Sequence, residues 1–372
     1  RAGVPLMVAG PNCMTAFVLI TDPGPDPDDA KALLVLAILH RRQAVRLAAV
    51  VCNGGGPEQV GMRARLARCL LVHVGVLDVP VGVGSPGRPR VPQAYEYRLP
   101  DMQGMDDTSC AAALRKGPAL LREVVSRAAP KSLTFVCISS LRDVADLIQE
   151  DEQGFLAKVR EVSIQGGLER DPGTGALCPD TSTNNQADPE AARFVYRHLL
   201  SRRVPLTVVS RHAVPYVPMR LASTMAAATG CAVIEYLAQA QLMGLVGLWA
   251  RVCAGGQLPP YCTRMWFFQT FCGMTQAQFE ADATLQDLPP STDIRPHLNG
   301  VIKPYDVVAL MAVLPTTRYL FAQPARDAED SGAQTRLYYL PGSQAVAGEH
   351  VQALLEETFA AVAAACTECS RP

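Results

Sequence analysis

The chain has 372 residues, of which 49% are hydrophobic and 19% charged, so it can bury a large core and does not have the composition of a disordered protein. Its 34 Lys and Arg residues nearly balance its 35 Asp and Glu residues, which argues against a nucleic-acid or membrane-surface role that depends on a basic field. The length fits one large α/β domain or two ordinary ones and excludes a disulfide-stapled mini-protein.

The first part of the chain alternates short β-branched runs with amphipathic stripes, which is typical of strand–helix–strand units and a parallel sheet. The predicted strands are 16–21, 46–52, 80–84, 133–138, 161–165 and 205–209. The predicted helices are 28–41, 57–74, 111–128, 141–149 and a segment from Asp188 to about Leu200. Residues 85–110 and 168–187 are expected to be irregular, and loops of such length are usually functional.

From about residue 214 to 290 the pattern becomes mainly helical, and helices are expected again at 306–313 and 351–362. The apolar stretch 231–254 is interrupted by polar side chains, among them Glu235 and Arg251, so a packed helix is expected and not a membrane span. We therefore expect an α/β fold with a doubly wound, mostly parallel open sheet and a mostly helical C-terminal elaboration. Within a single domain, the core would cover about 16–210, the elaboration 214–300 and a closing segment 301–365.

The twelve cysteines are scattered and lie mostly in apolar surroundings, as reduced thiols of an intracellular, cytoplasmic protein do. Cys366 and Cys369 form a CxxC with no second CxxC and no adjacent His, so they are read as a feature of the tail and not as a zinc site. Because the chain begins with Arg, an organellar targeting segment stays open.

Polar residues follow the predicted strands, where ligands bind in an open parallel sheet. Asn53, Ser139 and Gly166 each follow a strand, and the first strand is followed by four carboxylates within eight positions. Like charges so close together cost free energy unless a cation or a raised pKa relieves them. A hard divalent ion such as Ca²⁺ suits oxygen ligands. The alternative is that Asp28 or Asp29 only caps the next helix.

The segment ITDPGPDPDDAKAL resembles the N-terminal fingerprint DTDPGxDDAxAL of the inosine–uridine-preferring nucleoside hydrolases, with Ile20 in place of the first Asp and two extra residues before Asp28. Five further segments resemble motifs of that family in the same order, so that the resemblance covers nearly the whole chain: VVCNGG, FVCISSLRDVADLI, VSIQGG, STNNQADPEAARFVY and KPYDVVALMAVLP.

The resemblance implies a Ca²⁺-dependent hydrolase that splits ribonucleosides into free base and ribose. The implied metal ligands are Asp22, Asp29, the carbonyl of Ile138 and Asp306. The implied ribose-binding residues are Asp28, Asn53, Ser182, Asn184 and Asp306, with Ser182 where the family usually has a glutamate. Asp22 would be the general base that activates water.

Proton donation to the leaving base is assigned to Tyr305, where the family frequently has a histidine, and His212 and His297 are the other candidates. Trp266, Phe267 and Phe268 fit either core packing or base stacking. The expected partner is a small ribonucleoside, with no nucleic acid and no membrane, in a homo-oligomer or a larger complex. Two other functions stay open: a nucleoside-hydrolase-like structural or binding subunit with weakened turnover, and a hydrolase of a related ribosyl compound.

Overall fold

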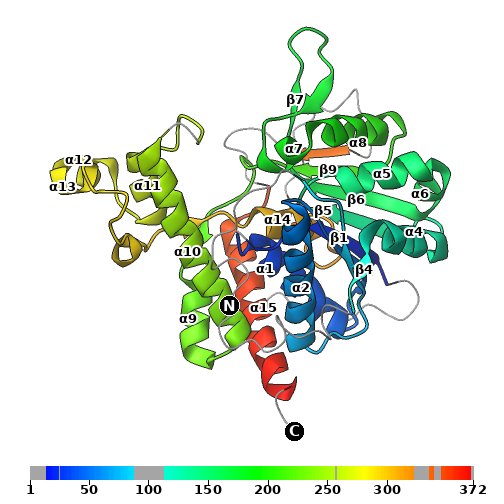
Figure 1. The fold of residues 1–372 in the computed structure, drawn as a ribbon, viewed down its shortest axis with the longest axis horizontal. Helices are drawn as coiled ribbons and strands as arrows, with labels where there is room; N and C mark the ends of the chain where they lie inside the picture. Colours follow the sequence, from blue (N-terminus) through cyan, green and yellow to red (C-terminus); the bar gives the residue numbers. More distant parts are fainter. Residues whose placement is uncertain are drawn as a thin grey trace.

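In the computed structural model, residues 14–24, 26–87, 113–255, 258–321 and 345–369 are described, together with the backbone of 335–338. Eight strands form one sheet in the order β12-β9-β6-β5-β1-β2-β3-β4, and every neighbouring pair is parallel (Figure 1). The strands are β1 Ala16–Thr21, β2 Arg46–Cys52, β3 Val81–Val83, β4 Arg115–Lys116, β5 Leu133–Cys137, β6 Val159–Gln165, β9 Leu206–Val209 and β12 Thr335–Tyr338. The doubly wound parallel sheet expected from the sequence is thereby confirmed.

Helices cover both faces of this sheet because alternate side chains of each strand point to opposite faces. Phe17 and Leu19 of β1 lie in one buried cluster, and Val18 and Ile20 lie in the other. The first face is covered by α1 Asp28–Arg41, α2 Pro57–His73, α14 Tyr305–Met311 and α15 Gly348–Cys369. The second face is covered by α4 Gly117–Arg127, α5 Arg142–Glu150, α6 Glu152–Lys158 and α8 Pro189–Ser201.

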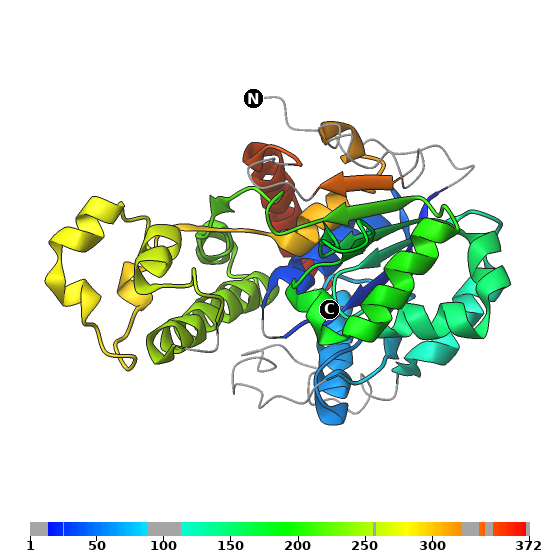
Figure 2. The same ribbon diagram turned by 90° about the horizontal axis from the view of Figure 1, so that it is seen from above.

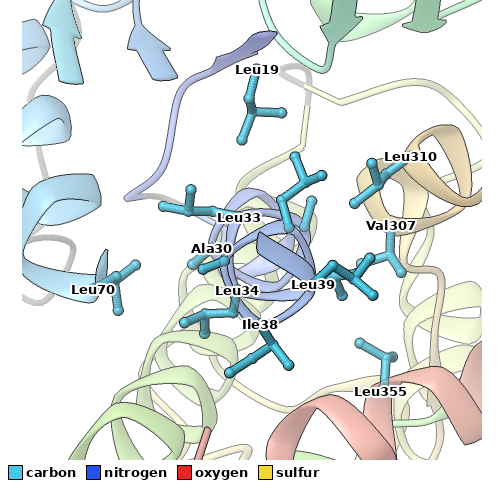
Figure 3. Close-up of a cluster of buried hydrophobic side chains, with 14 of the residues drawn as sticks. Leu19, Ala30, Leu33, Leu34, Ile38, Leu39, Leu70, Val307, Leu310 and Leu355 are labelled. Carbon is cyan, nitrogen blue, oxygen red and sulfur yellow. The ribbon is translucent and has the colours of Figure 1, made fainter. Parts of the chain in front are cut away.

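Helix α1 is buried along almost its whole length, from Asp28 to Leu39. Figure 3 shows its apolar side chains pointing in several directions at once, toward Leu19 of β1, Leu70 of α2, Leu310 of α14 and Leu355 of α15. A helix that is apolar all round is typical of a core element. The first turn of α1, which carries the paired carboxylates, is therefore fixed by packing on every side.

A mostly helical part stands to one side of the sheet (Figures 1 and 2). It contains α9 Leu221–Thr229, α10 Ala232–Ala254, α11 Arg264–Phe271, α12 Gln276–Ala281 and α13 Ala283–Gln286. Its own buried cluster is centred on Trp249, whose ring lies 5.2 Å from that of Phe267 and 5.6 Å from that of Phe268. This part is the helical elaboration that the sequence predicts.

Helix α10 joins the two regions, because Val233 to Ala240 belong to the core beside the sheet and Leu245 to Val252 to the cluster of Trp249. Among the described residues it is the one helix long and apolar enough to cross a membrane by length and composition, and 28% of its apolar window is buried. It packs against both clusters, but most of that window stays partly exposed.

Four local predictions were wrong or incomplete. The helix expected at 111–128 begins at Gly117, because Arg115–Lys116 pairs with the edge of β3 and Pro118 opens the helix. The stretch 168–187 contains a hairpin of β7 Leu168–Arg170 and β8 Leu177–Pro179 and the short helix α7 Thr183–Ala187. Helix α6 and strand β12 had no predicted counterpart. Most of the stretch expected to be irregular, 88–110, lies outside the described residues.

Two short strands and two 3₁₀ turns complete the described part of the chain. The strands β10 Val217–Pro218 and β11 Val301–Ile302 pair antiparallel and tie the base of the helical part to the segment before α14. The 3₁₀ turns are Arg295–His297 and Arg318–Leu320.

Candidate functional site

The sheet changes its winding direction between β1 and β5, which are neighbours in space although β2, β3 and β4 come between them in the chain. The crevice beyond the carboxyl ends at such a point is where open α/β sheets bind ligands. Asp22 follows β1 directly and Ile138 follows β5, and the Ile138 N–H continues the ladder to the Ile20 carbonyl at 2.9 Å. Two of the predicted site residues, Asp22 and Ile138, therefore lie at this crevice.

The turn between β1 and α1 is closed by its own carboxylates. One oxygen of Asp29 accepts hydrogen bonds from the Thr21 hydroxyl at 2.5 Å and from the Asp22 N–H at 2.9 Å. Asp26 accepts one from the Asp28 N–H at 3.1 Å. The residue that caps α1 is Pro27, with no side-chain cap in the described turn, so the idea that Asp28 or Asp29 serves only as a helix cap is wrong.

Asp306 lies far away in the sequence but joins this turn, since its N–H donates to Asp28 Oδ2 at 2.9 Å. Helix α14 packs directly against α1, and both helices begin at this point. The sequence prediction that carboxylates from the first and last parts of the chain meet is consistent with this contact.

Burial changes the acidity of these three carboxyl groups. It raises the pKa of Asp28 to about 8, with the nearby Lys31 opposing and Asp26 adding to the rise. Burial also raises the pKa of Asp29 to about 6, against the hydrogen bonds from Thr21 and Asp22. The pKa of Asp306 lies well above its usual value because of burial and the carboxylates of Asp29 and Asp28. The positive charges near these three carboxyl groups are therefore too few to offset the cost of ionising all of them.

An arginine that the sequence reasoning missed sits in the same crevice. Arg63 of α2 is 3% exposed, and its guanidinium donates to Asp22 Oδ2 at 2.9 Å and to the Asn53 carbonyl at 2.6 Å. The signal was present, since Arg63 lies three residues after Val60 and four before Ala67 on the buried face of an amphipathic helix. A charged residue at a core position of a helix indicates a partner inside.

The amide of Asn53 is fixed by the protein. Its Nδ2 donates to the Ser140 carbonyl at 2.9 Å and to Asp143 Oδ2 at 2.8 Å, which leaves the amide oxygen facing the other way. That buried oxygen has no hydrogen-bond partner among the described residues. Burial raises the pKa of Asp143, while hydrogen bonds from Asn53 and Ser85 oppose the rise.

Ser182 and Asn184 lie at the start of α7, beside the end of β6. The Ser182 hydroxyl is buried and without a hydrogen-bond partner in the described part of the chain. Asn184 Nδ2 donates to the Ile138 carbonyl at 3.0 Å and to Gln165 Oε1 at 2.6 Å. The carbonyl predicted to bind a metal thus already accepts one hydrogen bond, although a carbonyl oxygen has a second lone pair.

The donor chemistry around the turn suits a hard cation. The predicted ligands offer only oxygen, and Asp28 Oδ1 is buried with no partner among the described residues. As placed, no three His, Cys, Asp or Glu side chains of the described residues converge into a preformed metal centre. Arg63 supplies part of the missing positive charge by pairing with Asp22. The residues therefore fit such an ion in chemistry and burial, and their side chains would have to turn toward it.

A cavity of about 570 Å³ opens beside the carboxylate turn and reaches under the helical part. Asp26, Asp28 and Tyr305 line it, and α10 contributes Gln241, Leu245 and Leu248 to the lining. A volume in this range is typical of small-molecule sites. Burial, and then the neighbouring Asp28, raise the pKa of Tyr305, which keeps its proton at neutral pH.

The other residues predicted to contact the nucleobase differ in whether they line this cavity. His212 lines the cavity, whereas His297 does not and instead lies edge-on to Phe268, with ring centres 6.0 Å apart. Phe267 and Phe268 are fully buried in the helical part, while Trp266 is a cavity residue. Core packing therefore accounts for the two phenylalanines, and Trp266 is left with an aromatic face at the cavity.

The fold is that of an α/β protein with a doubly wound sheet. A carboxylate cluster at its switch point with a cavity beside it is typical of a small-molecule site. The family model of the inosine-uridine preferring nucleoside hydrolases matches residues 17–339, so the chain belongs to this family. The resemblance found in the sequence is thereby confirmed.

Three known proteins illustrate the similarity. The non-specific ribonucleoside hydrolase RihC of Salmonella enteritidis PT4 (strain P125109) is 28% identical over 186 residues, which is 49% of this chain and 57% of RihC. The type III effector XopQ, solved as a complex with adenosine diphosphate ribose, is 26% identical with a TM-score of 0.71 over 97% of this chain and 95% of XopQ. The purine-preferring ribonucleoside hydrolase from Gardnerella vaginalis shares the fold at 13% identity and a TM-score of 0.54, over 95% and 99% of the two chains.

Proposed function

We propose that this protein hydrolyses the N-glycosidic bond of ribonucleosides, in a Ca²⁺-dependent reaction, to free base and ribose. The observation that carries the proposal is a set of buried oxygens without partners among the described residues. They are Asp28 Oδ1, Asn53 Oδ1 and Ser182 Oγ, all on residues expected to bind ribose. A buried polar atom left unpaired costs free energy, so such atoms are commonly satisfied by a ligand or by water. Ribose hydroxyls are donors of the right kind for these oxygens.

The cation would be held by Asp22, Asp29, Asp306 and the Ile138 carbonyl. When bound, Ca²⁺ supplies positive charge that neutralises the carboxylates and orients a sugar diol. The raised pKa of Asp29 and of Asp306 supports this assignment, because a bound cation would favour the ionised carboxylates that burial disfavours.

The chain's own side chains supply the rest of the chemistry. Asp22 would accept the proton of the attacking water, and the ion pair with Arg63 orients its carboxylate. Tyr305 would donate a hydrogen bond or a proton to the departing base, with His212 as the second donor on the same cavity wall. Asn53 is held by Asp143, so its oxygen can receive a ribose hydroxyl without moving. A 2′-deoxy sugar would leave these oxygens unpaired and be rejected.

The direct test follows ribose release from inosine, uridine and adenosine in Ca²⁺ and in EDTA, with Asp22→Ala as the inactive control. We expect release by the native chain in Ca²⁺ and its loss in EDTA. Release no higher than that of Asp22→Ala with all three nucleosides would refute the proposal. Glu161→Gln is a matched control that should keep release, because Glu161 is a buried carboxyl that pairs with Arg160 and Arg318 and is not among the proposed site residues.

A binding function with weakened turnover is the second candidate, and the Arg63–Asp22 pair favours it. A guanidinium 2.9 Å from the proposed base competes with a cation for the same carboxylate. Tyr305 in place of a histidine points the same way. If sugar release fails, calorimetry with Ca²⁺ and with uridine separates a binding protein, which retains both affinities, from a structural subunit, which has neither.

A further inference from the structure

The cavity beside the carboxylate turn carries more positive charge than a neutral nucleoside needs. Its lining includes four basic side chains: Lys31, Arg211, Arg251 and Lys303. None of the four forms an ion pair with a carboxylate of the described residues, and the two acidic groups on the lining are Asp26 and Asp28. Four basic side chains face two carboxylates, so the wall has a positive excess even with both carboxylates ionised.

Two of these cations are held together against mutual repulsion. Lys303 Nζ donates to the Arg211 carbonyl at 2.9 Å and lies 4.8 Å from the ring centre of Tyr216. The Arg211 guanidinium lies 5.6 Å from the ring centre of Tyr261. Burial and the charge of Arg211 lower the pKa of Lys303, and burial, Arg211 and Lys303 lower that of His212. These are the effects of a cationic cluster that lacks an anion.

The third cation is buried and lines the same cavity from helix α1. Lys31 of α1 is 3% exposed, and the one hydrogen bond of its ammonium group in the described structure goes to Gln241 Oε1 of α10 at 3.0 Å. An ammonium group has three donors, so burial with one neutral acceptor leaves its charge poorly compensated. Lys31 follows Asp28 by three positions in α1 and both line the cavity, so this cation lies beside the proposed ribose site.

We infer that the site takes a ribosyl compound that carries a phosphate, a ribonucleoside 5′-monophosphate in its simplest form. The inference rests on the proposed function in one respect: if the 2′- and 3′-hydroxyls meet the carboxylate turn and C1′ carries the base, only the 5′-oxygen is left to bear the phosphate. Arg211 and Lys303 supply charged donors for it, and Arg is well suited to phosphate through paired N–H bonds. The rings of Tyr261 and Trp266 leave an aromatic surface for the base.

The test compares affinities in matched pairs by titration calorimetry on the full chain, with uridine against uridine 5′-monophosphate and inosine against inosine 5′-monophosphate. We expect each monophosphate to bind at least about tenfold more tightly than its nucleoside, the order of one charge-assisted hydrogen bond. Inorganic phosphate alone should bind far more weakly than either monophosphate, because it lacks the ribose. Equal affinity for nucleoside and monophosphate would overturn the inference, and so would inorganic phosphate that binds as tightly as the monophosphate.

Variants then locate the phosphate. In Arg211→Gln and in Lys303→Gln, the ratio of nucleoside to monophosphate dissociation constants should fall about tenfold. Arg220→Gln is the matched control, since Arg220 is exposed in the same helical part and does not line the cavity. A ratio that persists in both cavity variants refutes the assignment. If thermal melting shows that a variant is not folded, the ratio of nucleoside to monophosphate dissociation constants of the native chain still tests the inference.

Sugar release, followed separately, distinguishes this inference from the proposed function. Release of ribose from nucleosides without any preference for monophosphates would leave the proposed function standing and remove the phosphate site. Tight binding of monophosphates without release of ribose or ribose 5-phosphate would support the phosphate site and refute the proposed function.

Discussion

Stability should fall with rising pH in the absence of Ca²⁺ and depend much less on pH in its presence. Without a cation, Asp28 and Asp29 keep protons in the folded chain up to about pH 8 and about pH 6, while the same groups in the unfolded chain ionise near 3.8. The folded state then binds more protons than the unfolded state between these values. Unfolding free energy must therefore fall as the pH rises through this window.

The size of the effect follows from the shift at Asp29 alone. A folded-state pKa of about 6 against 3.8 predicts a loss of about 1.4 kcal/mol between pH 5 and pH 8. For a chain of this size that corresponds to a melting temperature lower by roughly 2 °C, and Asp28 adds to it. Bound Ca²⁺ would keep both carboxylates ionised and remove this loss.

The assay is thermal unfolding at pH 5, 6, 7 and 8, in parallel buffers with Ca²⁺ and with EDTA. We expect the gain in melting temperature on adding Ca²⁺ to grow with pH, and Asp29→Asn to abolish most of that growth. In Asp143→Asn the growth should persist, because Asp143 titrates at the same edge of the sheet without binding the ion. Curves that stay parallel from pH 5 to 8 would refute the view that these carboxyls hold a cation.

Three further outcomes follow from particular contacts. Arg63→Met should lower the unfolding free energy, measured in urea, by about 2 kcal/mol, which is less than for a fully buried pair because Asp22 is partly exposed. Adding Asp22→Asn to this variant should recover part of the loss. An unchanged unfolding free energy in Arg63→Met would mean that the pair does not stabilise the fold. Tyr305→Phe should slow ribose release from inosine more than from an activated aryl riboside, and equal slowing would remove its role as acid. Leu34→Ala should cost about 2 to 5 kcal/mol, whereas the exposed Leu77→Ala should change stability by less than about 0.5 kcal/mol, and similar values would contradict the packing of α1.

Periodicity was enough to predict the sheet and the helices that pack on it, because each buried strand and amphipathic helix repeats its apolar residues in a regular pattern. Strand β1 and helix α1 agree with the prediction residue for residue. Short elements carry too few residues for a period to emerge. Strands β7 and β8 have three residues each, and the two residues of β4 form a strand only because β3 offers an edge.

The site was predictable where the residues stand in a local motif and less so where the fold brings them together. Asp22, Asp28 and Asn53 follow strands and could be read directly. The pairing of Arg63 with Asp22 and the link from Asn184 to the Ile138 carbonyl depend on which helix lies over which strand end. The cationic lining has the same origin, since Lys31 and Lys303 come from opposite ends of the chain.

Helix α1 ties the binding turn to the interior, with consequences for engineering and for evolution. Apolar residues pack against α1 on all sides, so Asp28 and Asp29 cannot easily shift to accommodate a different ligand. For the same reason, substitutions deep in the core should change the geometry of the turn. On the cavity face of α10, Gln241 and Leu248 are half-buried and Arg251 is exposed, so these positions can vary at lower cost. Libraries aimed at altered selectivity should therefore diversify Gln241, Leu248 and Arg251 and leave the first turn of α1 unchanged.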